Sequence, residues 1–147
     1  MPKIRTLKSK PPPAGFEDIE PELEELNRKM REAELEPHDG KRKNESLWQV
    51  IRVNHQRSRF VFNLYFREKK ISKELFDYLL KEQWADAALI AKWKKPGFDN
   101  LCCLQCVMGT AHNHGGACIC RVPRRDLDKG KLVECQACGC RGCASGD

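Results

Sequence analysis

The sequence predicts a mainly α-helical fold, with an N-terminal helical domain and a C-terminal cysteine-rich zinc cluster domain of little regular secondary structure. Two observations lead to this prediction. Between residues 16 and 98, apolar residues recur at the three- and four-residue spacing of amphipathic helices, and all eleven aromatic residues fall there. All nine cysteines lie after residue 101, and residues 101–147 contain no Phe, Trp or Tyr. Because this second segment cannot build an apolar core, we expect bound metal to hold it.

Composition divides the chain into three expected segments: a flexible basic arm (1–15), a helical domain (16–98) and the cysteine-rich domain (99–147). The arm carries four basic and no acidic side chains in its first ten residues and ends in PPPAG, where proline favours extended backbone. No apolar segment follows the arm, and no apolar run approaches the roughly 18 residues that span a bilayer. We therefore expect neither a secretory signal nor a membrane partner.

The first expected helix covers residues 18–35. Its apolar residues are spaced by three, four and three positions, which places them on one helix face: Leu23, Leu26, Met30 and Ala33. Asp18 is the expected N-terminal cap, and the glutamates that follow it suit the positive end of the helix dipole.

Three further helices are expected. The second covers residues 45–67, where apolar and aromatic residues again follow helical spacing. The third begins after Ser72, which is suited to cap it, and runs through Leu80. The fourth is rich in alanine, runs from Trp84 to Trp93 and ends before a Pro-Gly pair.

The formal net charge of +6 is unevenly distributed. Residues 11–36 carry nine acidic and three basic side chains, whereas residues 41–70 carry nine basic and two acidic ones. Such runs form solvated helix faces in many proteins, but a basic surface also attracts nucleic acid. The candidate phosphate-binding residues are Arg52, Arg57 and Arg59 on the second helix, and Arg121, Arg124, Arg125, Lys129 and Lys131 beside the cysteines.

The cysteines form the most specific pattern in the sequence, and three C-x2-C pairs occur among them. Two residues between thiolates allow both to face one ion from a tight turn, and Zn²⁺ prefers four tetrahedral nitrogen or sulfur ligands. The additional C-C and C-x-C spacings are too tight for separate mononuclear fingers, so they indicate a cluster in which some sulfurs bridge two ions. The candidate metal ligands are Cys102, Cys103, Cys106, Cys118, Cys120, Cys135, Cys138, Cys140 and Cys143.

Nine thiolates match three tetrahedral zinc ions if three sulfurs bridge, because all twelve coordination positions are then filled and no thiol is left over. A site with two zinc ions needs eight ligands and leaves one thiol unused. His112 and His114 are alternative ligands, each of which can replace a bridging thiolate. An odd cysteine count disfavours full disulfide pairing, and the number of ligands disfavours an iron–sulfur centre. The spacing does not indicate which thiolates bridge.

The expected metal site is structural, and we do not expect an enzyme. A catalytic zinc ion keeps one coordination position open for water. Residues 100–125 contain no acidic side chain that can act as a base, and neither the zinc deaminase pattern nor an H-E-x-x-H motif is present. The cysteines therefore predict saturated coordination.

Several segments together resemble the bud-site-selection protein 31 family, also called the G-ten family. They are LCCLQC (101–106), CICRVPR (118–124), ECQACGCRGCASGD (134–147) and FVFNLYFREKKIS (60–72). The similarity runs from the opening MPKIRT to Asp147, and the cysteine-rich tail is its most specific part. The resemblance implies that the zinc cluster of that family maps onto the same nine cysteines.

The resemblance also implies a function. It implies a nuclear, non-catalytic, architectural component of the spliceosome that acts in pre-mRNA splicing. The partners it implies are the backbones of spliceosomal RNA and pre-mRNA, together with other spliceosomal proteins, and we expect a monomer within a large ribonucleoprotein complex. The residues do not indicate which RNA or protein is contacted, or at which assembly stage.

Two other functions stay open on the sequence. A transcriptional co-regulator can dock in a hydrophobic receptor groove through an aromatic helix face, here Phe62, Tyr65 and Phe66. We expect this stripe to lie in the helical core instead, so the exposure of the three rings bears on the choice. A zinc-dependent ubiquitin ligase can recruit its conjugating enzyme through zinc knuckles, but such domains usually hold two separate ions around apolar loops.

Metal chelation tests the division into helical and metal-dependent parts. We expect a chelator to unfold the C-terminal third and to leave the helical signal of residues 18–93, because only the tail lacks an apolar core. Circular dichroism with and without chelator measures this. Loss of all helical signal, or no loss of structure at all, would contradict the prediction.

Overall fold

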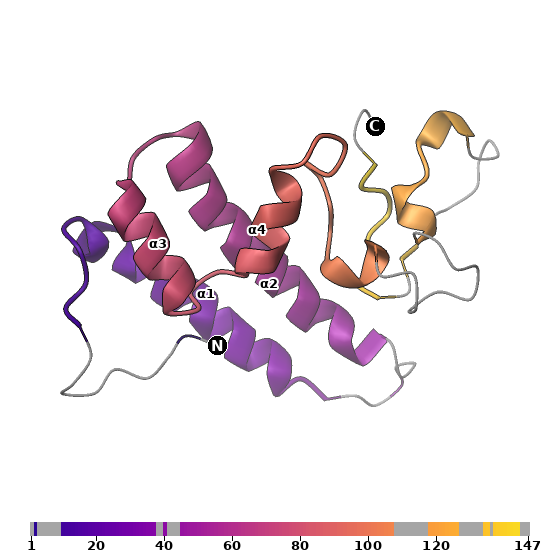
Figure 1. Cartoon of the computed structure of the whole chain (residues 1–147). Coiled ribbons are helices and arrows are strands. Elements are labelled where there is room, and N and C mark those ends of the chain that lie inside the picture. The colour runs from indigo at the N-terminus through magenta and orange to yellow at the C-terminus, as the bar shows by residue number, and fades with distance from the viewer. Residues whose placement is uncertain are drawn as a thin grey trace. The chain divides into compact units, whose positions relative to one another are not determined.

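Figure 1 shows a computed structural model of the chain, which describes residues 10–37, 45–107, 118–126, 134–135 and 137–144 together with Pro2 and Gly40. The α-helices in these residues are α1 (Phe16–Glu34), α2 (Trp48–Phe62), α3 (Lys73–Lys81) and α4 (Ala87–Trp93). Short 3-10 turns are η1 (Glu45–Leu47), η3 (Leu104–Val107), η5 (Ile119–Arg121) and η6 (Arg124–Asp126), and α2 continues into a π-helical turn, η2 (Asn63–Arg67). The described residues include no strand, so the prediction of a mainly α-helical fold with an irregular cysteine-rich region is confirmed.

None of the helices that the structure describes combines the length and the apolar character needed to cross a membrane.

The chain forms two compact units, each built from two separate stretches of sequence. The first unit comprises Met1–Glu36 and Val53–Ala87, and the second comprises Pro37–Arg52 and Ala88–Asp147. The first residues of α2 therefore belong to the same unit as the cysteines, and the remainder of that helix belongs to the first unit. The division expected from composition, after residues 15 and 98, stays a prediction about domains.

The core of the first unit is built from apolar faces of its helices. In α1 the expected stripe is present, with Leu23, Met30 and Ala33 buried and Leu26 half-buried. The buried apolar residues of this unit are Phe16, Ile19, Leu23, Met30, Ala33, Val53, Val61, Leu64, Leu75, Phe76, Leu79 and Ala85. Its two stretches contain no cysteine, so none of the predicted metal ligands lies in this unit, and burial of its apolar side chains stabilises it.

Helix α1 begins earlier than the sequence predicts. Its N-terminal cap is Gly15, with a φ of +94° and no side-chain hydrogen bond, so the prediction of Asp18 as the cap is wrong. The reason is Phe16, whose side chain is 1% exposed and packs against the rings of Tyr78 and Trp84 at centroid distances of 5.7 and 6.0 Å. Glycine adopts the left-handed conformation that the start of α1 requires without the strain of a Cβ atom.

The other helix boundaries follow the predicted pattern with one difference. Ser72 caps α3, and its hydroxyl oxygen accepts a hydrogen bond from the N–H of Leu75 at 3.2 Å, as expected. Helix α4 is shorter than expected because the residues before Ala87 form a turn, in which Gln83 has a φ of +63° and the N–H of Trp84 donates to the Leu79 carbonyl.

The aromatic stripe at the end of α2 is only partly buried. Phe66 is 37% exposed, whereas Phe62 and Tyr65 are half-buried. Tyr65 stacks on Phe76 at a centroid distance of 4.4 Å, and Phe66 meets the same ring edge-on at 5.5 Å. The stripe therefore extends the helical core as expected, but its outermost ring, that of Phe66, reaches the solvent.

Candidate metal centre

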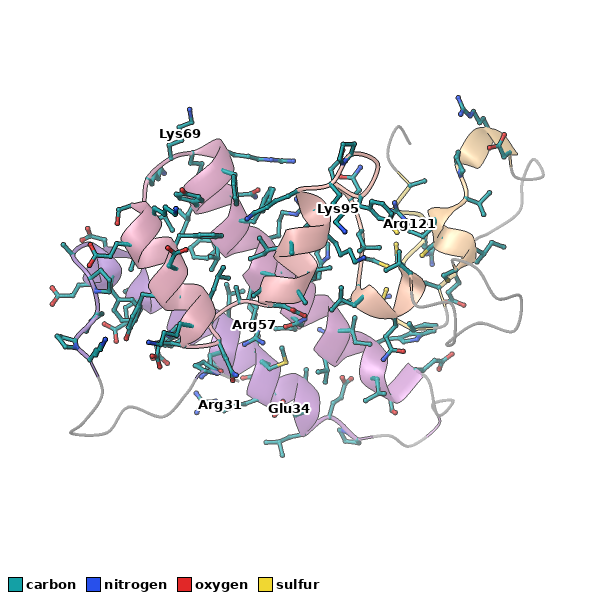
Figure 2. The ribbon with its side chains drawn as sticks, in the orientation of Figure 1. Arg31, Glu34, Arg57, Lys69, Lys95 and Arg121 are labelled. Carbon is teal, nitrogen blue, oxygen red and sulfur yellow. The ribbon has the colours of Figure 1, made fainter. Side chains whose placement is uncertain are left out.

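The second unit gathers the cysteines into one buried region. Eight of the nine are buried and Cys140 is half-buried, and all nine are free thiols. Figure 2 shows sulfur atoms beside the labelled Arg121. The sulfurs of Cys106 and Cys135 approach to 3.0 Å, well beyond the roughly 2.05 Å of a disulfide bond. The thiols are thus close together without covalent links.

Backbone hydrogen bonds join segments that are distant in sequence. The N–H of Cys118 donates to the Cys106 carbonyl at 2.8 Å, which ties the start of η5 to η3. The N–H of Cys143 donates to the Cys120 carbonyl, also at 2.8 Å, which ties the tail to η5. These bonds bring the sulfurs of all three segments to one place.

The sulfur atoms form three groups of four, and within each group all four lie within 4.8 Å of one another. We name the groups A, B and C. Group A contains Cys102, Cys106, Cys135 and Cys138; group B contains Cys102, Cys120, Cys140 and Cys143; and group C contains Cys106, Cys118, Cys120 and Cys135.

Some sulfurs belong to two groups. Cys102 is common to groups A and B, Cys120 is common to B and C, and both Cys106 and Cys135 are common to A and C. Cys103 belongs to none of the three, but its Sγ lies 3.5 Å from that of Cys106 and 3.9 Å from that of Cys102. All nine predicted ligands therefore lie in one connected set of sulfurs.

The donor set suits a soft metal ion. Each group offers four thiol sulfurs, and no carboxylate or imidazole of the described residues belongs to any group. Sets of four sulfurs are typical of zinc and of iron–sulfur centres, whereas Mg²⁺ and Ca²⁺ prefer oxygen ligands. The residues thus fit zinc. His112 and His114, the alternative ligands, lie outside the described residues.

Hydrogen bonds among the crowded thiols move their pKa values in opposite directions: the pKa of Cys102 is raised, chiefly by Cys103, whereas the pKa values of Cys103 and Cys143 are lowered. Hydrogen bonding, chiefly from Cys102, lowers the pKa of Cys103 to about 3. Hydrogen bonds from Cys102 and Cys120, with a smaller contribution from Arg121, lower the pKa of Cys143 to about 7. Thiolate sulfur is the form that coordinates metal, so these positions are suited to bind an ion at neutral pH.

The start of α2 packs against the cysteine-rich tail, a contact that the sequence analysis did not predict. Arg52 donates from Nε to the Cys138 carbonyl at 3.3 Å and from Nη2 to the Gly139 carbonyl at 3.4 Å. A Cβ atom at Gly139 would lie 2.6 Å from Cε3 of Trp48 and 2.7 Å from Nη2 of Arg52. Gly139 also has a φ of +74°. The glycine between Cys138 and Cys140 was the only signal of this close approach in the sequence.

Arg57 does not form part of a basic surface on α2, so that expectation is wrong. Its side chain is buried, its Nε and Nη2 donate to Oδ1 of Asn54 at 3.1 and 2.9 Å, and its Nη1 donates to the Gln83 carbonyl at 3.4 Å. Burial lowers the pKa of Arg57, and the nearby Asp86 carboxylate opposes that shift. Arg57 therefore links α2 to the turn before α4 inside the first unit.

The fold and the site define a small, mainly helical protein that carries a buried cluster of cysteines. The family described as Pre-mRNA-splicing factor BUD31 matches residues 1–145. Protein BUD31 homolog of Branchiostoma belcheri is 58% identical over 144 residues, which cover 98% of this chain and 99% of that protein. Pre-mRNA-splicing factor BUD31 of Saccharomyces cerevisiae is 46% identical and Pre-mRNA-splicing factor cwf14 of Schizosaccharomyces pombe is 48% identical, each over the full length of both chains. The chain belongs to the BUD31 family, as the cysteine-rich tail indicated.

Replacing Gly139 with alanine tests the contact between α2 and the tail. Gly97→Ala is the matched control, because Gly97 has a φ of +86° but a Cβ atom there would meet nothing within 4 Å. Both changes cost about 1–2 kcal/mol in the left-handed conformation, and only Gly139→Ala also displaces Trp48 or Arg52. We expect Gly139→Ala to lower the free energy of unfolding by about 1–3 kcal/mol more than Gly97→Ala, measured by urea denaturation of the zinc-loaded protein. Equal losses would show that the contact is unimportant.

Proposed function

We propose that the chain is a non-catalytic, architectural component of the spliceosome that acts in pre-mRNA splicing in the nucleus. The observation that carries this proposal is the family match over residues 1–145, together with relatives whose names refer to pre-mRNA splicing and which align over the whole chain. The role we propose is to hold RNA backbone and neighbouring spliceosomal proteins together, with the chain present as a monomer within the larger complex.

The cysteine groups support a structural zinc cluster as the rigid part of this component. We propose that all nine cysteines hold three Zn²⁺ ions, one in each group. Groups A and B share Cys102, and groups B and C share Cys120. Groups A and C share two sulfurs, those of Cys106 and Cys135. A single bridging sulfur between these two groups is sufficient for nine thiolates to fill twelve coordination positions. Cys103 lies close enough to Cys102 and Cys106 to complete group A when either Cys106 or Cys135 becomes a ligand of group C alone.

This assignment accounts for every thiol and leaves no coordination position for water. Nine sulfurs then fill twelve positions, with Cys102, Cys120 and either Cys106 or Cys135 as bridges. A zinc ion surrounded by four sulfurs has no open site at which to activate a water molecule, which supports a structural rather than a catalytic role.

Two single substitutions in group B test the assignment of sulfurs to the three ions. One removes a sulfur that two groups share, and the other removes a sulfur that belongs to group B alone. Cys120 belongs to groups B and C, whereas Cys140 belongs to group B alone. We expect native mass spectrometry to find three zinc ions and one chain in the wild type. Cys140→Ala should weaken the binding of one ion, and Cys120→Ala should weaken the binding of two. A wild type with two zinc ions, or equal losses in the two variants, would contradict the proposed cluster.

Exposed cations of the second unit support a contact with RNA backbone. Lys95, Arg125 and Arg141 are exposed in the same unit as the cysteines. The Arg125 side chain is 85% exposed, and its ion pair with Asp126 spans 4.0 Å, so it is weak in water and can yield to a phosphate. Phosphate contacts position a protein on RNA without reading its bases. Lys129 and Lys131, also suggested by the sequence, lie outside the described residues.

Depletion and add-back in a splicing-competent nuclear extract tests the function. We expect depletion of the resident family member to block conversion of pre-mRNA to mRNA, and the purified zinc-loaded chain to restore it. Ultraviolet light should then crosslink the chain to RNA within the assembled complex. Normal splicing in the depleted extract would rule out the proposed role.

Charge reversal separates an RNA contact from general electrostatic attraction. The test variant combines Lys95→Glu with Arg125→Glu, and the matched control combines Lys29→Glu with Arg31→Glu on the exposed surface of α1. We expect the test variant to crosslink several-fold less than the control, with the zinc content of both unchanged. Equal crosslinking would assign Lys95 and Arg125 to solubility alone.

A further inference from the structure

Arg121 joins three parts of the second unit through one side chain. Its Nη1 donates to the Cys143 carbonyl and, at 3.5 Å, to the Sγ of the same residue. Its Nη2 donates to the Gly97 carbonyl at 2.6 Å. The guanidinium carbon lies 5.3 Å from the ring centroid of Phe98. The half-buried guanidinium is therefore directed at the end of the cysteine-rich tail, and Figure 2 shows it next to the sulfur atoms.

The sulfur that Arg121 contacts belongs to a single group. Cys143 is a member of group B alone, so a change in its position or charge acts on one of the three proposed ions. Its N–H is held by the Cys120 carbonyl, and its Sγ lies 3.5 Å from that of Cys120. The position of Cys143 is thus set by η5 on one side and by Arg121 on the other.

The proposed cluster needs positive charge close by. Nine thiolates carry three more negative charges than three Zn²⁺ ions neutralise. In a buried region this excess is poorly screened, so a nearby cation stabilises it strongly. Arg52 lies at the carbonyls of Cys138 and Gly139, on the side of group A. Arg121 is the corresponding cation at group B.

We propose that Arg121 is a positioning residue for the metal ion of group B: its guanidinium orients Cys143 and offsets the negative charge of the thiolates. This inference rests on the zinc cluster proposed above and adds to it a residue that is not a ligand. It also assigns Arg121 to the cluster rather than to the RNA-binding surface that the sequence suggested.

The geometry requires arginine rather than any cation. The planar guanidinium donates in two directions at once, towards Gly97 and towards Cys143, while its face rests on the Phe98 ring. The ammonium of Lys92 lies 5.9 Å from the centroid of the same ring, so it flanks the site without replacing those hydrogen bonds. A lysine at position 121 keeps the charge but has no rigid fork with which to span both partners.

Metal release from the full-length, zinc-loaded protein tests the proposal. The variants are Arg121→Gln, which removes the charge, and Arg121→Lys, which keeps it. Arg125→Gln is the control, since the Arg125 side chain is 85% exposed and, among the residues that the structure describes, pairs with Asp126 rather than with a cysteine. We expect Arg121→Gln to release one zinc ion to a chromogenic chelator about 10- to 100-fold faster than the wild type. The other two ions should leave at the wild-type rate, Arg121→Lys should lie between the two, and Arg125→Gln should match the wild type.

Cadmium NMR supplies a readout that a general loss of stability does not move. In protein loaded with cadmium-113, we expect Arg121→Gln and Arg121→Lys each to shift one metal resonance and to leave the other two in place. This measurement is made on the folded, metal-loaded protein, and the lysine variant supplies it if the glutamine variant fails to fold.

The outcomes distinguish this inference from the cluster on which it rests. A wild type that holds no zinc overturns the cluster and the role of Arg121 together. A wild type with three ions, whose release is unchanged by Arg121→Gln, overturns the role of Arg121 alone. Accelerated release of all three ions together, or shifts of all three cadmium resonances, would show that Arg121 supports folding generally and would overturn its assignment to group B.

Discussion

The close approach of buried sulfur atoms is the constraint on which the second unit depends. The Sγ of Cys106 lies 3.0 Å from that of Cys135 and 3.2 Å from that of Cys102. Thiolates at such distances would repel one another in a buried region, and the zinc ions proposed above would supply the positive charge that offsets this repulsion. The first unit shows the contrast, because it contains no cysteine and buries apolar side chains instead. One short chain thus combines two different means of stabilisation.

Three arginines of the basic stretches make contacts within the protein, two of them in the cysteine-rich unit and one in the helical unit. Arg52 donates to carbonyls of the cysteine-rich tail, and Arg121 donates to the last cysteine and to the segment after α4. Arg57 is buried in the first unit against Asn54. In the sequence all three belong to basic stretches that look like a nucleic-acid surface. Burial removes Arg57 from the surface available to phosphate, whereas Lys95 and Arg125 are exposed.

Much of the fold follows from local patterns, and what does not follow comes from distant contacts. The helices, the Ser72 cap and the set of clustered cysteines depend on spacing and on side-chain type, so the sequence predicts them. The start of α1 was mispredicted because Phe16 is fixed by Tyr78 and Trp84, which are far away in sequence. The contact of Trp48 with Gly139 is missing from the prediction for the same reason: no local pattern pairs α2 with the tail. Which sulfurs the groups A, B and C share likewise depends on contacts between distant segments, so the spacing of the cysteines does not predict it.

The membership of the sulfur groups has a consequence for biosynthesis. Groups A and C both need Cys135, and group B needs Cys140 and Cys143. These are among the last cysteines to be translated, whereas the sequence of the first unit is complete at Ala87. A ribosome that has reached residue 134 has made a chain whose helical unit can already fold but in which no group of four is complete. For the zinc cluster proposed above, metal loading would therefore be a late maturation step, and a message that stops just short of this point encodes a chain without a complete group A, B or C.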